Sequence, residues 1–203
     1  MIFLKVSNMR LIKPSKKYAT SFWRGVLAMR REDKKAFSEY GKFATAEEYV
    51  QLASDHVKGK NLPPNWIPYH TYWAIIGADV VGQAQLRTTL TKHLREVGGQ
   101  IGYGIFPKFR KRGYGKLQLA LTLKKAQKLG MKKLNITCDD TNLGSKKPML
   151  AVHQHNELEA TEQIVNRLQR GERIVLVQVA QEAQDEVRAH AQLRAGIDAG
   201  AVQ

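Results

Sequence analysis

The alternation of apolar and polar residues changes period near the middle of the chain. Ile101, Tyr103 and Ile105 alternate with small or polar residues, which is the period of two that a strand requires. Pro107 has no N–H to donate and so predicts the end of this strand. From Leu117 onward the apolar residues recur at helical spacing. The pattern therefore predicts a strand, a turn and a helix in succession.

Other segments show the same two periods. A stripe of apolar residues between Tyr18 and Met29 predicts a helix that faces the core. Thr45, three residues before Glu48, forms a capping-box pattern and predicts the start of a second helix. The remaining predicted elements are strands over residues 9–14, 71–76, 79–87 and 133–138, with a longer connection over residues 88–98.

The composition is that of an ordinary globular protein. The chain has 203 residues, of which 43% are hydrophobic and 25% charged, which is enough for one domain with a substantial core. No apolar run approaches the ~20 residues of a membrane span, so no membrane partner is expected. A single cysteine, Cys138, excludes an internal disulfide. No signal-peptide core is recognisable, so the reducing cytoplasm is the expected location.

The net charge of +15 is concentrated in one part of the chain. Residues 148–203 contain five Arg, no Lys and eight Asp plus Glu, a net charge of −3, so residues 1–147 carry +18. A surplus of this size indicates an acidic partner. Phosphate groups of a ligand would account for a few of these charges. The remainder would be solvated surface, or would attract RNA or an acidic substrate.

The turn between the central strand and its helix has the composition of an anion site. Arg110, Lys111 and Arg112 are consecutive cations, and Gly113 and Gly115 lack the Cβ that would keep another molecule from the backbone. The following helix begins with N–H groups that have no intrahelical partner, at the positive end of its dipole. The expected anion is a phosphate or pyrophosphate. The spacing matches neither the dinucleotide-binding glycine pattern nor a P-loop.

The pattern Arg110-x-x-Gly113-x-Gly115 resembles the Arg/Gln-x-x-Gly-x-Gly/Ala motif of the GNAT superfamily of N-acetyltransferases, which bind acetyl-CoA. The setting strengthens this resemblance, because a strand precedes the motif, a helix follows it, and a second strand leads to Asn142-x-x-Ser145. The resemblance implies an α/β (α+β) fold with a mixed, mostly antiparallel central sheet flanked by helices. It also implies acetyl-CoA as co-substrate.

The resemblance further implies which residues would bind acetyl-CoA. Backbone groups near Tyr103 and Ile105 would hold the pantetheine arm, and an N–H there would polarise the thioester carbonyl. Asn142 would bond to the same arm, with Ser145 as a further contact. The pyrophosphate would lie in a cradle formed by Lys111, Arg112, Gly113, Tyr114 and Gly115.

The implied chemistry is direct attack by an amine on a thioester held between two splayed parallel strands, here those ending at Phe106 and Cys138. It needs no protein nucleophile and no metal, so Cys138 is interpreted as a buried strand residue. Many family members use a Glu of the central strand as the base, but this strand carries Gln100. His93 and Glu96 are the candidate bases; the alternative is that both are exposed loop residues. The acceptor is expected to be an amine-bearing small molecule or peptide.

The resemblance stops at Lys147, which predicts an acetyl-CoA-binding domain over residues 1–147 and a separate segment over residues 148–203. This segment contains no aromatic residue, whereas the family usually closes with aromatic-rich strands. Its pattern indicates a helix near residues 157–170, an apolar run over 174–179 and a helix over 181–194. Two explanations stay open: a divergent C-terminal unit, or a change of reading frame near Lys147.

Two other functions also stay open. The charge of residues 1–147 is compatible with a nucleic-acid- or ribosome-associated protein on a GNAT-like scaffold, although no RNA-binding motif is visible. The unusual tail is compatible with a chain that binds acetyl-CoA without turnover. An N-acetyltransferase with an unidentified acceptor is favoured, because it explains the basic turn and its setting together.

Overall fold

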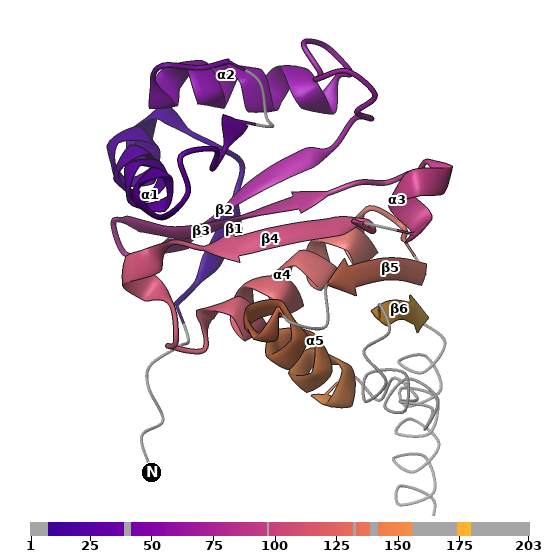
Figure 1. Ribbon diagram of the computed structural model, residues 1–203. Helices are drawn as coiled ribbons and strands as arrows, with labels where there is room; N and C mark the ends of the chain where they lie inside the picture. The colour runs from indigo at the N-terminus through magenta and orange to yellow at the C-terminus, as the bar shows by residue number, and fades with distance from the viewer. Residues whose placement is uncertain are drawn as a thin grey trace, which may run out of the picture.

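A four-stranded antiparallel sheet forms the centre of the fold. The computed structural model describes residues 8–38, 42–96, 98–131, 133–138, 142–155 and 174–179. The strands lie in the order β1, β2, β3, β4, and each pairs antiparallel with the next. Helices cover both faces of the sheet (Figure 1), so the predicted mixed α/β fold with a mostly antiparallel sheet is confirmed.

The elements follow one another along the chain in an order that alternates helices with strands. They are β1 (Arg10–Ile12), η1 (Lys16–Tyr18), α1 (Ala19–Glu32), α2 (Ala46–Val57), β2 (His70–Ile76), β3 (Asp79–Leu86), α3 (Lys92–Glu96), β4 (Ile101–Ile105), η3 (Pro107–Phe109), α4 (Tyr114–Lys128), β5 (Lys133–Cys138), α5 (Leu143–His155) and β6 (Ile174–Val179). Within the described residues, no helix is long and apolar enough to span a membrane.

Helices α1 and α2 pack on one face of the sheet through a cluster of aromatic rings. Phe22 of α1 is fully buried and stacks on Trp73 of β2, with ring centroids 4.3 Å apart. Phe22 also stacks on Tyr49 of α2 at 4.8 Å, so one side chain joins both helices to the sheet. Val26, one turn further along α1, is equally buried. The apolar stripe predicted in this region therefore faces the core.

The predicted capping box begins α2. The hydroxyl oxygen of Thr45 accepts a hydrogen bond from the N–H of Glu48 at 3.2 Å. The Glu48 carboxylate accepts a bond from the N–H of Ala44 at 2.7 Å, one residue before the cap. Both bonds satisfy donors that the helix itself cannot.

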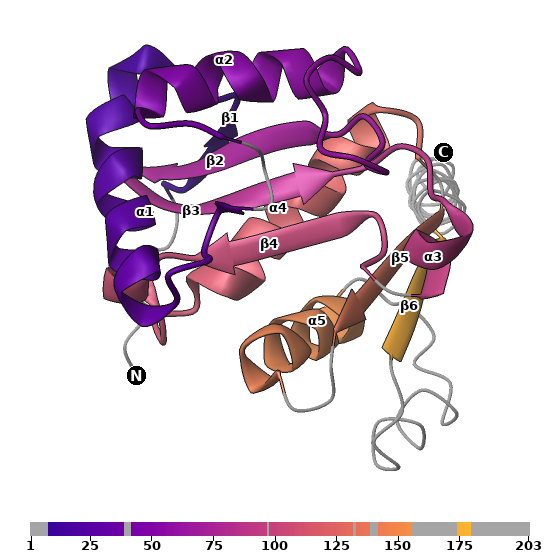
Figure 2. The ribbon, with the colours of Figure 1, turned by 45° about the horizontal axis from the view of Figure 1, so that its top comes forward.

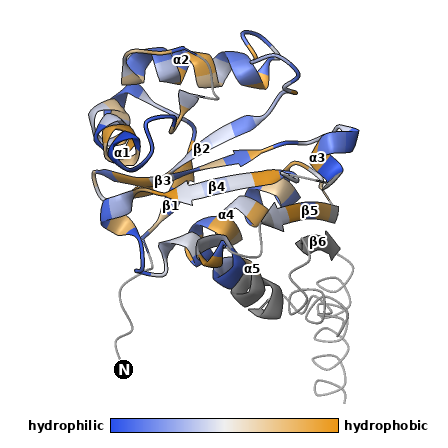
Figure 3. Cartoon of the chain, viewed as in Figure 1, coloured by the Kyte–Doolittle hydropathy of each residue, from blue (hydrophilic) through white to orange (hydrophobic). Residues whose placement is uncertain are grey.

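Helix α4 covers the opposite face of the sheet. Its residues Leu119, Leu123 and Ala126 are buried against apolar strand residues. The helix ends at Lys128 and is terminated by Gly130, which has φ +76° and donates to the C=O of Gln127 at 2.9 Å. This is the glycine termination that the sequence predicts. Figure 3 shows hydrophobic residues gathered on the strands and on the helix surfaces that face them.

Strands β5 and β6 form a separate two-stranded antiparallel sheet beside β4. The apolar run predicted at residues 174–179 is β6, and Leu176 lies opposite Ile136 in the register. The helices predicted over residues 157–170 and 181–194 lie outside the described residues. Helix α5 contains Pro148 and continues across the predicted domain boundary, which stays a prediction.

A glycine in α1 lets the helix lie close to the end of β4. A Cβ built on Gly25 would lie 2.3 Å from the ring of Phe106, which is 3% exposed. Because real Cβ contacts are never that short, any side chain at this position must displace the ring. Gly25 therefore sets the distance between α1 and the last residues of β4.

We predict that Gly25→Ala lowers the free energy of unfolding by about 1–3 kcal/mol, because the added methyl group overpacks the core against Phe106. Helix propensity alone predicts the opposite sign, since Ala is favoured over Gly within a helix by roughly 1 kcal/mol. Urea denaturation, which measures the free energy of unfolding, distinguishes the two predictions. Introducing G25A should cost less stability in the F106L background than in the wild type, and a G25A protein more stable than the wild type would contradict the contact.

A buried histidine fastens the end of α2 to the chain before β2. His56 is 1% exposed, and its Nε2 lies 2.9 Å from the C=O of Asn61, so this nitrogen carries the proton. Its Nδ1 therefore accepts a bond from the hydroxyl of Tyr69. Burial lowers the pKa of His56 below its ordinary value of 6.5, so the native state holds this ring neutral.

We predict that stability falls as the pH drops from 7.5 to 5.5, because the unfolded chain then binds a proton at His56 more readily than the folded chain does. The pKa of His70 is also lowered, by burial and then by Lys13, and contributes with the same sign. His56→Gln should reduce the difference in unfolding free energy between the two pH values. His70→Gln should reduce the same difference, and a difference left unchanged in both variants would contradict the assignment.

Candidate active site

Strand β4 directs part of its backbone away from β3. The N–H of Phe106 donates to the C=O of Val81 at 2.9 Å. In an antiparallel pair, residues that bond to the neighbouring strand alternate with residues whose backbone groups point away from it. The backbone groups of Tyr103 and Ile105 therefore point toward β5. Consistent with this, the C=O of Ile105 accepts a bond from Nε of Arg110 at 3.0 Å.

Strands β4 and β5 meet near the beginning of β4 and then separate. The N–H of Gln100 donates to the C=O of Asn135 at 2.7 Å, and the N–H of Asn135 donates to the Gln100 side chain. A Cβ on Gly99, which has φ +57°, would lie 2.3 Å from the Asn135 oxygen, so this approach requires glycine. Strand β5 pairs with β6 along its whole length, and Figure 2 shows β4 and β5 diverging after this contact. The splay expected between these strands is present.

The basic turn leads directly into α4. Lys111 and Gly113 both have left-handed backbone conformations, with φ +59° and +78°. Gly113 is the N-cap residue of α4, which begins at Tyr114. The N–H groups of the first helical turn and the positive end of the dipole therefore lie at this turn. Lys111 and Arg112 are exposed beside it.

Arg110 has a different role from the two cations that follow it. Its Nη1 forms an ion pair with the Glu32 carboxylate at 2.6 Å, and its Nη2 lies 2.9 Å from the sulfur of Met29. Together with the bond to Ile105, these contacts hold the guanidinium against the end of α1. Arg110 therefore fastens the turn to α1 and β4, whereas Lys111 and Arg112 are the exposed cations beside the start of α4.

Gly115 lies where α4 approaches both β4 and α5. A Cβ at this position would be 3.4 Å from Cγ of Pro148 and 3.9 Å from the side chains of Ile105 and Tyr103. A methyl group would make ordinary contacts there, whereas a larger side chain would fill the space between the three elements.

The beginning of α5 lies beside β4. The hydroxyl of Tyr103 donates to the C=O of Ser145 at 3.1 Å. The side-chain oxygen of Asn142 accepts a bond from the N–H of Ser145 at 3.1 Å and so caps α5. The residues predicted to bind a cofactor thus come from β4, the basic turn and the beginnings of α4 and α5, which the fold brings together.

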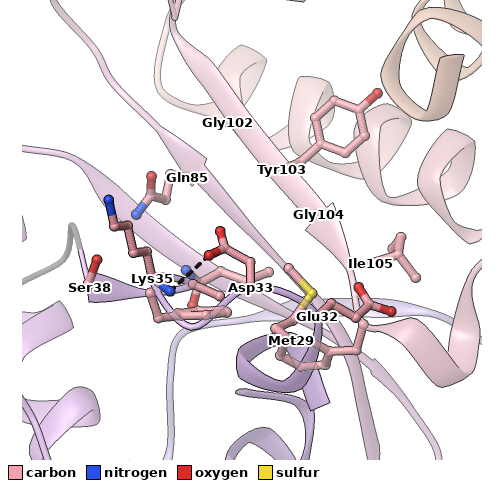
Figure 4. A pocket seen from close by; sticks show the side chains of 14 residues that line it. Met29, Glu32, Asp33, Lys35, Ser38, Gln85, Gly102, Tyr103, Gly104 and Ile105 are labelled. Atoms are coloured by element: carbon pink, nitrogen blue, oxygen red, sulfur yellow. Dashed lines mark hydrogen bonds between the residues drawn. The ribbon is translucent and has the colours of Figure 1, made fainter. Parts of the chain in front are cut away.

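A cavity of about 550 Å³ lies on the α1 face of the sheet, where the end of α1 passes over β3 and β4 (Figure 4). The chain after α1 forms one wall, and polar residues of β3 and the glycine-rich strand β4 form another. The lining residues are Met29, Glu32, Asp33, Lys35, Ala36, Phe37, Ser38, Gln83, Gln85, Gly102, Tyr103, Gly104, Ile105 and Phe106.

Two adjacent carboxylates belong to this cavity. Glu32 pairs with Arg110, as described above. Asp33 is exposed, and its Oδ1 accepts a bond from the N–H of Lys35 at 2.9 Å (Figure 4). The sequence did not identify these two carboxylates as residues of a cavity, because a mixed run of charges at a helix end is typical of solvated surface. The signal that would have identified them is their place at the end of an apolar stripe that packs on the central sheet.

The candidate bases proposed from the sequence lie elsewhere. His93 is exposed on α3, at the opposite end of β4 from the basic turn (Figure 1), and it is not among the lining residues of the cavity. Glu96 is the last residue of the same short helix. Both precede β4 in the chain, whereas the cavity is lined by residues 102–106 of β4 and its C-terminal end. Among the described residues, no group of three or more His, Cys, Asp or Glu is placed to hold a metal ion.

Comparison with known proteins gives a single family. The family model described as an acetyltransferase (GNAT) domain matches residues 17–153. A search of curated proteins found no match.

Solved structures with the same fold include several acetyltransferases. The microcin C7 self-immunity acetyltransferase MccE, solved in complex with acetyl-CoA and AMP, has a TM-score of 0.52 and 15% identity, covering 72% of this chain and 78% of that one. The ribosomal L7/L12 alpha-N-protein acetyltransferase RimL has a TM-score of 0.50 and 14% identity, covering 75% and 80%. A putative ribosomal-protein-serine acetyltransferase from Vibrio cholerae has a TM-score of 0.48 and 19% identity, covering 72% and 79%. At these identities the likeness shows the fold.

Proposed function

Because the chain belongs to the GNAT acetyltransferase family, we propose that it binds acetyl-CoA on the α4 side of β4 and transfers the acetyl group to a primary amine in the cavity on the α1 side. The observation that carries this proposal is the open edge of β4. Its outward backbone groups lie between the anion-favouring start of α4 and a cavity that contains carboxylates. MccE, which shares the fold, was solved with acetyl-CoA bound.

The α4 side offers groups for each part of the cofactor. The N–H groups of Gly113, Tyr114 and Gly115 would bind the pyrophosphate, with the Lys111 and Arg112 side chains neutralising its charge. Asn142 and Ser145, at the start of α5, would contact the pantetheine arm, as would the backbone of Tyr103. The N–H of Ile105 would donate to the thioester oxygen and stabilise the negative charge that develops there during attack.

The attacking amine must lose a proton, and Asp33 is the group in the cavity best suited to receive it. Its carboxylate is exposed within the lining, whereas the neighbouring Glu32 is committed to Arg110. The amine nitrogen forms a bond to the carbonyl carbon as the carbon–sulfur bond breaks. The proton passes to Asp33, and the thiolate of coenzyme A takes up a proton from solvent. His93 and Glu96 stay as alternative bases.

We predict that Gly113→Val weakens acetyl-CoA binding about 10- to 100-fold, the loss expected when a hydrogen bond to a charged group is removed. A β-branched residue cannot adopt φ +78° without strain, so the N–H groups at the start of α4 would be displaced. Isothermal titration at low and moderate salt measures the affinity.

Gly130→Val is the matched control for this titration. Gly130 has φ +76° and lies at the other end of the same helix, with open space where a Cβ would be. The G130V variant should lower the free energy of unfolding by about as much as G113V does, and it should leave the affinity for acetyl-CoA unchanged. Equal binding by G113V and the wild type would contradict the assigned site. A folded wild-type protein that does not bind acetyl-CoA would instead bring the nucleic-acid-associated function forward.

We predict that Asp33→Asn lowers kcat about 10²- to 10⁴-fold, the usual contribution of a general base, with little change in acetyl-CoA affinity. The assay is release of coenzyme A thiol with an amine that the wild-type protein acetylates, measured across pH. Glu32→Gln is the matched neighbour and should have a smaller effect. If D33N kept full activity while H93A or E96Q lost activity, the base would be His93 or Glu96 of α3.

A further inference from the structure

The side-chain amide of Gln85 is buried in the cavity wall, and its nitrogen lacks a hydrogen-bond partner among the described residues. Gln85 lies on β3, opposite Gly102 of β4, and is 3% exposed. Figure 4 shows it among the side chains that surround the cavity. A buried N–H group without a partner is unfavourable, because it has lost its bonds to water and gained none in return.

A second glutamine on the same strand shows how the fold satisfies such a group. Gln83, two residues earlier, faces the same side of the sheet and also lines the cavity. Its Oε1 accepts bonds from the hydroxyl of Tyr49 at 2.8 Å and from Nε1 of Trp73 at 3.2 Å. Gln83 thus joins α2 to the sheet. Gln85 has no comparable structural role in the described residues.

The residue opposite Gln85 on β2 adds to this polar spot. Thr71 pairs directly with Gln85 in the register, so both side chains point to the same face. Its hydroxyl is also buried without a partner in the described part of the chain. Two neighbouring polar groups are therefore without partners at one point beside the cavity, where apolar side chains would be more stable.

Strand β4 leaves the approach to Gln85 open. At Gly102, a Cβ would lie 3.7 Å from Oε1 of Gln85, and at Gly104 it would have no neighbour within 4 Å. A molecule in the cavity can therefore lie along β4 next to the Gln85 side chain, and a rotation of that side chain would bring its buried Nε2 within reach of the molecule. Asp33 lines the same cavity and can interact with a positively charged amine.

We propose that Gln85 selects the acceptor: its Nε2 donates a hydrogen bond to an oxygen atom, of a carbonyl or a hydroxyl group, close to the amine that is acetylated. This rests on the proposed function, because it takes the cavity as the acceptor site. It predicts a preference for amines that carry such an oxygen over plain alkylamines of the same size. Gln85 is thus a specificity residue, and it takes no part in proton transfer.

The test uses three probes of similar size: alaninamide with a carbonyl, alaninol with a hydroxyl, and 2-aminobutane with neither. Each is titrated by NMR into the full chain saturated with coenzyme A, and the dissociation constants are compared. We expect alaninamide or alaninol to bind the wild type about five- to tenfold more tightly than 2-aminobutane, the contribution of one neutral hydrogen bond. The tighter of the two identifies the type of oxygen.

The variants distinguish a specificity role from a structural one. Gln85→Leu and Gln85→Met should both remove the preference, because neither side chain can donate a hydrogen bond. Gln118→Leu is the matched control: Gln118 of α4 is also buried without a partner among the described residues, but it does not line the cavity, so the preference should be kept. Equal binding of the three probes to the wild type, failure of all three to bind, or a preference retained in Q85L would overturn the proposal. The acetyltransferase proposal fails separately, by absence of acetyl-CoA binding or of acetyl transfer.

Discussion

The proposed site depends on the difference between the two edges of β4. One edge is hydrogen-bonded to β3, whereas β5 contacts the other edge only near the start of β4. The strands are joined by Gln100 and Asn135, and glycine at position 99 permits that close approach. Beyond this contact β4 and β5 diverge (Figure 2), so the outward backbone groups of Ile105 lie next to a widening gap. In a continuous sheet these backbone N–H and C=O groups would be hydrogen-bonded to the next strand. A preorganised N–H can stabilise developing charge only where the sheet is interrupted in this way.

Arg110 connects this edge to both binding regions. Its guanidinium bonds to the C=O of Ile105 and to the carboxylate of Glu32, which lies 78 residues earlier in the chain. The pair is partly exposed, so it contributes little to global stability. Its value is positional: it fixes the basic turn on one side of β4 and the end of α1 on the other. A shift of the basic turn or of the end of α1 would therefore displace β4, which lies between them.

The sequence was informative where one continuous stretch carries both structure and chemistry. The period of β4, the glycines of the turn and the apolar face of α4 lie within thirty residues, so the strand, the turn and the helix could be predicted together. The cavity could not, because its walls come from the end of α1, from β3 and from β4, which only tertiary packing brings together. His93 and Glu96 were chosen for closeness to β4 in sequence, and α3 lies at the wrong end of that strand for the cavity.

The two sides of β4 carry different residues, and on the cavity side the strand has only glycines. Tyr103 and Ile105 direct their side chains toward α4 and α5, whereas Gly102 and Gly104 place only hydrogen atoms on the cavity side. Lys111 and Arg112 are exposed at the turn before α4, whereas the cavity lining combines Glu32 and Asp33 with Lys35. In the proposed arrangement the anionic donor would lie on the first side of the strand, and the acceptor amine would lie near Asp33 on the second. Larger side chains at the glycines would keep the reacting atoms apart, so the small residues of β4 are as important to the chemistry as any charged group.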